Sequence, residues 1–172
     1  MAKARKAIKR KKVKHSIDSE WIYLKKSSIH NRGVFAFKNI PKGTEIVQYT
    51  GRKIRKKDSS AQSKRDDKNG TVYLFEVNLH FYIDGADKGS DAIYINHGCK
   101  PNCETQIEDN EIWIVALRRI KKGEELSYDY GFEPDVAIDS PCRCGHRNCR
   151  KYIVRETDFK KFKKILLKAN RS

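Results

Sequence analysis

The sequence lacks any long apolar run, and no stretch approaches the roughly 20 apolar residues that a helix needs to cross a bilayer. With a negative mean hydropathy and 35% charged residues, the composition excludes a membrane-spanning protein. The basic N-terminus is not followed by an apolar segment, so we expect no secretory signal peptide. These absences predict an intracellular protein with no membrane partner. Its 172 residues suit one domain.

Acidic residues are missing from the first 16 residues, which hold eight Lys or Arg, and the whole chain carries a formal net charge of +16. Large apolar residues are scarce there too, so we expect residues 1–18 to form a disordered basic arm. Such a charge run attracts phosphate backbones. It favours contact with nucleic acid or a nucleosome over a merely solvated tail.

No repeat of the solenoid type is present. Short β-like stretches alternate instead with turns, as in "GVFAFKNI" (33–40) and "EIWIVALRRI" (111–120). "TVYLFEV" (71–77) and "HFYID" (80–84) are typical of a hairpin, whereas the polar segment 55–70 is expected to be a loop or a frayed helix. This pattern favours a mostly β domain over a doubly wound fold.

The C-terminal stretch 157–169 changes to helical spacing. It places Phe159, Phe162, Ile165 and Leu166 on one face, with lysines opposite. Thr157 is expected to be the N-cap of this helix. We expect the apolar face to pack in the core in preference to lying on a membrane surface.

Three of the five cysteines form a C-x-C-x4-C pattern in "CRCGHRNC", at Cys142, Cys144 and Cys149. Their neighbours are polar, unlike those of buried core cysteines, and a C-x-C disulfide would be strained. Close thiolates in a polar loop suit a tetrahedral zinc site, so the spacing favours structural zinc over redox or free thiols. Three thiolates leave one position, either for water or for a distant ligand. The candidates for that ligand are Cys99, Cys103, His97 and His146.

An aromatic cluster surrounds an acid in "SYDYGF" (127–132). Alternation along a strand puts Tyr128 and Tyr130 on one face. Two phenols on one face form either a cross-strand aromatic ladder or the wall of a pocket for a cation. These residues alone leave both interpretations open.

Four pieces occur in one order: "IHNRGVFA" (29–36), "YINHGCKPN" (94–102), "GEELSYDYGF" (123–132) and "CRCGHRNC" (142–149). Together they resemble the SET-domain protein-lysine methyltransferases with a post-SET zinc motif. The second and third pieces are the most specific, being similar to the family's N-H-S-C-x-P-N and E-E-L-x-Y-D-Y-G. The resemblance covers roughly residues 20–153.

The resemblance implies a mostly β, β-clip-like fold of small curved sheets with a knot-like crossing, short helices and a C-terminal post-SET segment. It divides the chain into the basic arm (1–18), a SET domain (19–133) and a post-SET zinc segment with the amphipathic helix (134–172). It also implies S-adenosyl-L-methionine as the co-substrate and a protein with an exposed lysine as the partner.

Roles for single residues follow from the same resemblance. Arg32 and Gly33 match the loop that approaches the methionine part of the cofactor, and Asn96 and His97 match the pair that holds its adenosyl part. Tyr130 matches the catalytic tyrosine, which also contacts the cofactor.

The lysine channel is expected between Tyr73, Phe81 and Tyr128, of which Tyr73 and Tyr128 also count as catalytic. Tyr128 stands where other members have Phe, and this favours monomethylation. The chemistry agrees with these residue types, because a dry aromatic channel lowers the pKa of a lysine from its usual value of about 10.4. Methyl transfer then needs mainly correct positioning.

The resemblance assigns Cys99 as the fourth ligand of one structural zinc ion, beside Cys142, Cys144 and Cys149. It leaves Cys103 as a buried thiol and His146 as a loop residue.

Three positions depart from the family pattern: Asn31 replaces the first Gly of G-x-G, Gly98 replaces Ser, and Ile93 replaces a common Arg. Asn tolerates positive φ, whereas Ile93 puts the affinity for the cofactor in question.

The function implied is methylation of a lysine in a histone or another basic DNA-associated protein. The alternative is a catalytically weak or inactive zinc-stabilised module that binds chromatin or nucleic acid. We expect a monomer, located in the nucleus on chromatin if the source is eukaryotic. In a bacterium it is expected in the cytoplasm or nucleoid, or directed at a host.

Overall fold

The computed structural model describes residues 15–59 and 73–169. The expectations for the arm up to residue 14 and for residues 60–70 of the polar segment lie outside the described residues. Residues 56–58 of that segment form a single 3₁₀ turn. In the described ranges, no helix is long and apolar enough to cross a membrane.

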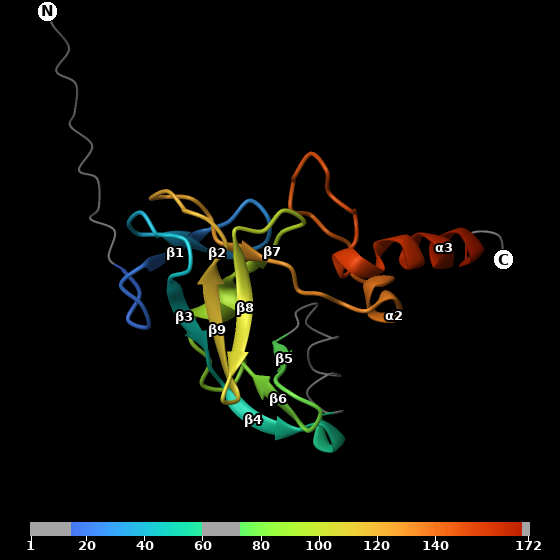
Figure 1. Ribbon diagram of the computed structural model, residues 1–172, viewed down its shortest axis with the longest axis horizontal. Helices are drawn as coiled ribbons and strands as arrows, with labels where there is room; N and C mark the ends of the chain where they lie inside the picture. Colours follow the sequence, from blue (N-terminus) through green and yellow to red (C-terminus); the bar gives the residue numbers. More distant parts are fainter. Residues whose placement is uncertain (1–14, 60–72, 170–172) are drawn as a thin grey trace, which may run out of the picture.

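Short strands in small sheets dominate the described chain (Figure 1). The strands are β1 (Ile22–Lys26), β2 (Arg32–Ala36), β3 (Glu45–Tyr49), β4 (Arg52–Arg55), β5 (Leu74–Glu76), β6 (Phe81–Asp84), β7 (Asn96–His97), β8 (Cys103–Glu108), β9 (Glu111–Ala116) and β10 (Ser127–Tyr128). The helical elements are η1 (Lys56–Asp58), η2 (Asp91–Tyr94), α2 (Pro134–Ala137), η3 (Glu156–Asp158) and α3 (Phe159–Ala169). The mostly β fold predicted from the sequence is confirmed.

The sheets are β1–β2, β3–β9–β8 and β4–β6–β5, all antiparallel, and the parallel pair β7–β10. The expected pairing of 71–77 with 80–84 is confirmed by β5 and β6. β9 is the central strand of its sheet, and its Ile112 and Ile114 are fully buried while Trp113 between them is half-buried. This alternation is the period of two that places every second side chain of a strand in the core.

Two chain segments cross at the β7–β10 pair, where residues 96–103 meet residues 124–128. Asn102 joins them, because its backbone N–H donates to Ser127 O (3.2 Å). The side chain of Asn102 donates to Glu125 O (2.8 Å) and accepts from the N–H of Ser127 (2.8 Å). Asn102 is 3% exposed, so one buried amide holds both segments in register.

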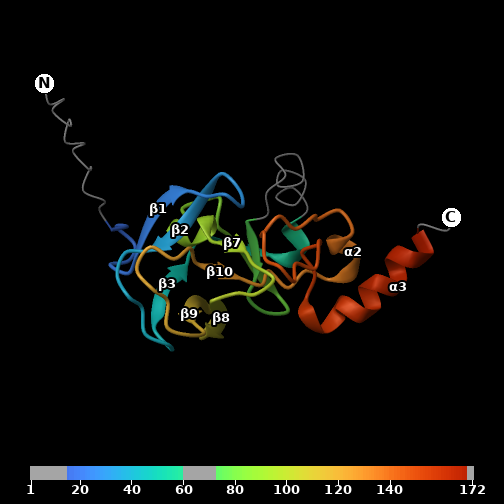
Figure 2. The same ribbon diagram turned by 90° about the horizontal axis from the view of Figure 1, so that it is seen from above.

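The C-terminal helices form a second small core at one end of the molecule (Figures 1 and 2). Phe162 of α3 is fully buried there with Val154 and Ala137. The helix predicted over 157–169 and the burial of its apolar face are therefore confirmed. Thr157 as N-cap is wrong: it lies inside η3, because the chain already turns at Glu156 before α3 begins.

We expect the crossing to depend on the Asn102 side chain. Asn102→Ala leaves the N–H of Ser127 and the carbonyl of Glu125 without their partners, which should lower the free energy of unfolding by about 2–4 kcal/mol. Urea denaturation measures this loss. Gln106→Ala on the exposed side of β8 is the control and should cost less than about 0.5 kcal/mol. Equal losses in the two variants would contradict the role given to Asn102.

Candidate active site and metal centre

A cavity of about 1030 Å³ lies beside the crossing. It is bounded by the turn before β2, by the segment from η2 to β7, and by the chain that follows β10. Its size suits a ligand larger than a typical metabolite fragment. The predicted site residues in its wall are Arg32, Tyr73, Asn96, His97, Tyr130 and Cys142.

The loop before β2 is held by Asn96. Its side-chain Nδ2 donates to Arg32 O (3.0 Å) and to Glu125 Oε1 (3.0 Å). Ser27 Oγ donates to the same Glu125 oxygen (2.6 Å). A Cβ at Gly33 would collide with this carboxylate, so glycine is required there for close approach. Asn96 therefore positions the backbone of residues 32–33 at the cavity.

Tyr130 lies two residues after the end of β10 and forms part of the cavity wall. Its hydroxyl donates to Ile95 O (2.8 Å), and its ring lies 5.5 Å from His97 and 4.9 Å from Tyr128 between centroids. Burial raises the pKa of Tyr130 and that of Tyr128 well above the usual value of a phenol. Both phenols are therefore neutral at physiological pH. They act through hydrogen bonds and ring faces and not as phenolate bases.

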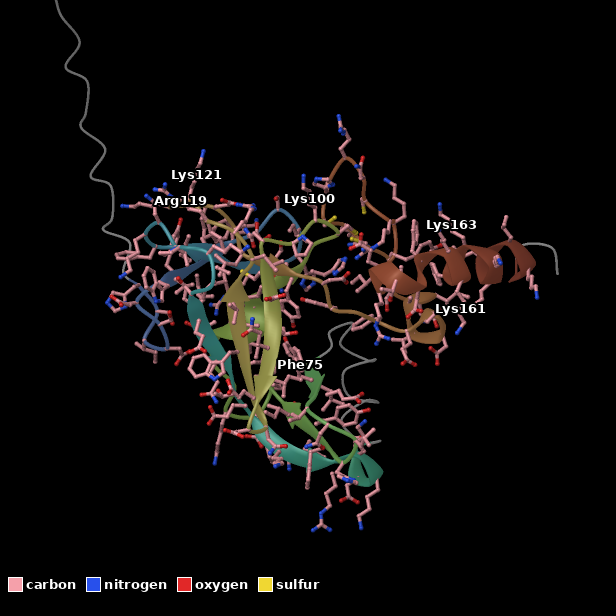
Figure 3. The ribbon with its side chains drawn as sticks, viewed as in Figure 1. Phe75, Lys100, Arg119, Lys121, Lys161 and Lys163 are labelled. Atoms are coloured by element: carbon pink, nitrogen blue, oxygen red, sulfur yellow. The ribbon has the colours of Figure 1, made fainter. Side chains whose placement is uncertain are left out.

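Phe75 on β5 belongs to the aromatic cluster around Tyr128, although it does not line the cavity. Its ring lies 6.2 Å from Tyr128 and 5.2 Å from Tyr49, and it is labelled in Figure 3. The hydroxyl of Tyr49 donates to the backbone carbonyl of Tyr73 (2.8 Å), which fixes the chain just before β5. The sequence analysis missed Phe75, because it stands between two other aromatic candidates on the same hairpin.

Phe81, the other expected channel residue, lies on β6 opposite Arg55 of β4. Its ring contacts are with the Lys53 ammonium (4.3 Å) and with His80 (6.4 Å). The lining of the cavity does not include Phe81 or Tyr128. A channel wall formed by Phe81 stays a prediction.

His97 is 4% exposed. Burial lowers the pKa of His97 to about 4, against the opposing effect of the Asp129 carboxylate. The ring is therefore neutral at physiological pH. The N–H of Tyr130 donates to Nδ1 (3.3 Å), so the ring proton is on Nε2, which faces Cys99 Sγ at 3.4 Å. His97 thus joins the cavity wall to the nearest thiol.

Four cysteines meet next to His97, and one of them, Cys142, also lines the cavity. The Sγ atoms of Cys99, Cys142, Cys144 and Cys149 all lie within 4.8 Å of one another. Cys99 Sγ is 3.6 Å from that of Cys142 and 3.9 Å from that of Cys149. Four thiolates at about 2.3 Å from a tetrahedral zinc ion are about 3.8 Å apart, so this donor set fits zinc.

Among the candidates for the distant ligand, the structure brings Cys99 to the three post-SET cysteines. Cys103 is fully buried behind the crossing, where its thiol donates to Asn102 Oδ1 (3.5 Å). His146 accepts the N–H of Asn148 inside its own loop (3.1 Å). The expected roles of Cys103 as a buried thiol and of His146 as a loop residue agree with these positions.

Arg150, next to Cys149, links the cysteine cluster to the tyrosines. Its guanidinium Nη2 donates to Asp129 Oδ2 (2.6 Å), and its side chain is 7% exposed. Its backbone N–H donates to Cys99 Sγ (3.4 Å). Asp129 lies between Tyr128 and Tyr130, so a buried ion pair holds the tyrosine segment against the cysteine loop. No sequence signal distinguished Arg150 from its basic neighbours.

Two departures from the family pattern have local explanations. A side chain at Gly98 would place its Cβ 2.7 Å from Ser127 Oγ, so glycine at 98 is matched to serine at 127. Asn31 has a φ of 39°, a left-handed conformation that Asn tolerates. Ile93 packs against the main core and lines the cavity.

A parallel strand crossing, a cavity with the neutral phenol of Tyr130 in its wall and four thiols beside it define the SET-type architecture with a post-SET cysteine motif. Residues 31–131 match the SET domain family, and the chain belongs to this family.

The chain is similar to several curated histone-lysine methyltransferases. It is 38% identical over 144 residues to histone-lysine N-methyltransferase 2D of Homo sapiens, covering 78% of this chain and 3% of that protein. It is 41% identical over 143 residues to histone-lysine N-methyltransferase trr of Drosophila melanogaster, covering 78% and 6%. For the H3 lysine-4 specific enzyme of Chaetomium globosum the identity is 39% over 136 residues, covering 74% and 13%. The chain thus spans a small part of the length of these relatives.

We expect Arg150 and Asp129 to be energetically coupled. Arg150→Gln leaves a partly buried carboxylate without its cation, and Asp129→Asn leaves the buried guanidinium with only the more distant carboxylate of Glu156 (3.9 Å). The double variant should recover about 1–3 kcal/mol of the summed losses in urea denaturation. The exposed pair of Lys38 and Glu20 is the control and should show far weaker coupling. Additive losses at Arg150 and Asp129 would exclude the link.

Proposed function

We propose that this chain transfers a methyl group from S-adenosyl-L-methionine to the side-chain amine of a lysine in a protein. The observation that carries the proposal is the cavity at the crossing, where partly buried Tyr130 and neutral His97 share a wall with the loop held by Asn96. The names of the relatives support a histone as the substrate. Another basic DNA-associated protein would offer the same exposed lysine side chains as a substrate.

The residues in the cavity wall fit the proposed cofactor. Arg32 lies at the cavity edge with Gly33 buried next to it, and Asn96 and His97 offer a buried polar surface in the same cavity wall. When bound, S-adenosyl-L-methionine supplies a sulfonium methyl group. Tyr94 receives the Arg32 guanidinium on its ring face at 5.3 Å, which holds this side chain at the same edge.

The chain's own contribution is to hold a neutral amine in line with the methyl donor. Tyr130 donates its proton to Ile95 O, so its oxygen lone pairs are free to accept an N–H of the amine. The rings of Tyr128 and Phe75 exclude water, which lowers the pKa of the lysine. Their π faces stabilise the positive charge that develops on nitrogen. Positioning and desolvation then supply most of the rate acceleration.

The number of methyl groups added depends on the space beside Tyr128. This side chain is 8% exposed and lies between Tyr130 and Phe75. Its hydroxyl occupies volume that a phenylalanine would leave open. We infer that a monomethylated product is favoured.

The four-cysteine cluster is proposed to hold one structural zinc ion. Four thiolates close the coordination sphere, so this zinc would have no open position for catalysis. Its role would be to pin the loop 142–150 and its Arg150 against Asp129. The basic N-terminal arm and the names of the relatives suggest that this protein is located on chromatin if the source is eukaryotic. If the source is bacterial, we propose that it is located in the nucleoid or directed at a host.

The first prediction concerns Tyr130. Tyr130→Phe removes the hydroxyl that orients the amine, and we expect kcat on a histone H3 peptide to fall by about 100-fold. Transfer of radiolabelled methyl measures the rate, and calorimetry should show cofactor binding retained. Tyr152→Phe in the second core is the matched control and should keep full activity. Failure of the unsubstituted chain to bind S-adenosyl-L-methionine or to label any protein would favour the inactive binding module.

The second prediction concerns the metal. Elemental analysis should find about one zinc per chain. Cys149→Ser should lose it and shift the thermal unfolding of the C-terminal segment to lower temperature, whereas Cys103→Ser should keep the ion because its thiol faces Asn102. If Cys99→Ser keeps full zinc occupancy, the proposed fourth ligand is wrong.

A further inference from the structure

Two lysine-rich turns lie side by side at the end of the molecule remote from α3. They are Pro-Lys-Gly at 41–43 and Lys-Lys-Gly at 121–123. Ile40 and Ile120 exchange two backbone hydrogen bonds of 2.9 Å just before the turns. The N–H of Lys122 donates to Asn39 Oδ1 (2.9 Å). The two turns are therefore fixed to each other although they lie 80 residues apart in the chain.

A third basic segment reaches the same end. Residues 118–119 continue from β9, and the N–H of Leu117 donates to Asn102 O (3.0 Å). Figure 3 shows Arg119 and Lys121 projecting together from this end, with Lys100 next along the same edge. We use the name basic cap for Lys42, Arg119, Lys121 and Lys122.

The cap carries charge that the protein itself does not neutralise. All four side chains are exposed, and in the described part of the chain none of them forms an ion pair. Neighbouring carboxylates are engaged with other cations, Glu124 with Arg118 and Glu20 with Lys38. Glu45 at the start of β3 is an exposed acid nearby. With it included, six cations face three carboxylates within residues 20, 38–45 and 118–124.

The basic arm leaves the described chain at the same end. The ring of His15 packs against Phe37, with centroids 5.6 Å apart, and Phe37 stands five residues before Lys42. The 14 residues that precede His15 hold eight Lys or Arg and no acid. The first described residue, His15, is thus fixed to the segment that leads to Lys42.

We infer that the basic cap binds the phosphate backbone of nucleic acid. Fixed cations from separate segments match closely spaced phosphates without reading bases, so binding is expected to be independent of sequence. The two turns hold only Pro, Lys and Gly, which leaves no apolar anchor for insertion into a bilayer. This surface goes beyond the proposed methyl transfer and does not depend on it.

Nucleic acid on the cap would leave the cofactor cavity open. β2 connects the two regions: Arg32 lies at the cavity, while Ala36 bonds to the turn through Gly123 (2.7 Å). Four residues of strand separate them by about 13 Å. The geometry thus allows an enzyme that is held on nucleic acid while its active site stays accessible.

The test uses the full chain and a fluorescein-labelled 20-base-pair DNA duplex, with anisotropy measured across a salt series. The cap variant reverses three charges, and the control variant reverses three exposed charges on β4 and η1. The substitutions are Lys42→Glu, Lys121→Glu and Lys122→Glu for the cap, and Lys53→Glu, Arg55→Glu and Lys57→Glu for the control.

The cap variant should lose more than about tenfold in affinity, and its log–log salt slope should become less steep by about 3. The control variant has the same net charge and should change by less than about twofold. Substituting the three cap lysines by Gln should give a smaller loss in the same direction. Zinc content and methyl transfer to a free peptide should be unchanged, which separates this result from the fate of the proposed function.

Equal losses in the cap and control variants would show a net-charge effect and overturn the assignment. No loss in either variant would leave binding to the arm alone and overturn it too. Vesicles of phosphatidylserine and phosphatidylcholine test the other source of phosphate. Tighter binding to vesicles than to DNA at equal charge, lost in the cap variant, would replace nucleic acid by a membrane surface.

Discussion

The crossing of residues 96–103 with residues 124–128 is the contact on which the rest of the site depends. Asn102 of the first segment closes it with hydrogen bonds to Glu125 and Ser127 of the second, and the parallel β7–β10 pair continues it. Asn96, His97, Cys99, Tyr128 and Tyr130 sit on one of these two segments or directly after it, whereas Arg32, Tyr73 and the other three cysteines of the cluster come from elsewhere in the chain. Because backbone hydrogen bonds fix both segments, the tyrosines, His97 and Cys99 have no independent freedom. One local contact therefore sets the geometry of the cofactor wall, the channel and the metal ligand together.

A buried ion pair extends this order to the C-terminus. The guanidinium of Arg150, which follows Cys149, pairs with the carboxylate of Asp129 between the two tyrosines. A buried cation is costly without an anion, so the loop has one favoured position against the crossing. Zinc at the four thiols would act on the same loop from its other end. The site is thus completed by residues about 50 positions apart, which links activity to the folding of the C-terminal segment.

The basic surface and the cavity lie in different parts of the molecule. The basic cap lies at one end of β2 and the cavity at the other. The proposed substrate, a histone tail, is basic like this chain, and repulsion between the two would weaken its direct capture. Binding to nucleic acid through the cap offers a physical solution, because the polyanion neutralises the enzyme and also concentrates basic proteins near it.

The local structure was largely predictable from the sequence. Alternation in 111–120 predicted β9, helical spacing predicted α3, and the C-x-C-x4-C pattern predicted that three thiols would meet, since these signals act over a few residues. The resemblance to the SET family supplied Cys99 and the cofactor residues. Thr157 failed as a cap because the 3₁₀ turn before α3 was invisible in the periodicity.

By itself the sequence determined the strands, the terminal helix, the basic charge and the identity of the thiols, because short-range propensities and spacing encode them. The tertiary structure alone decided that Phe75 packs on Tyr128, that Arg150 pairs with Asp129, and that two distant turns form one basic cap. The chain has many other aromatic and basic residues that could form each of these contacts, and local sequence does not distinguish among them. Strand register and chain crossing select among them, and both arise only when the whole core packs.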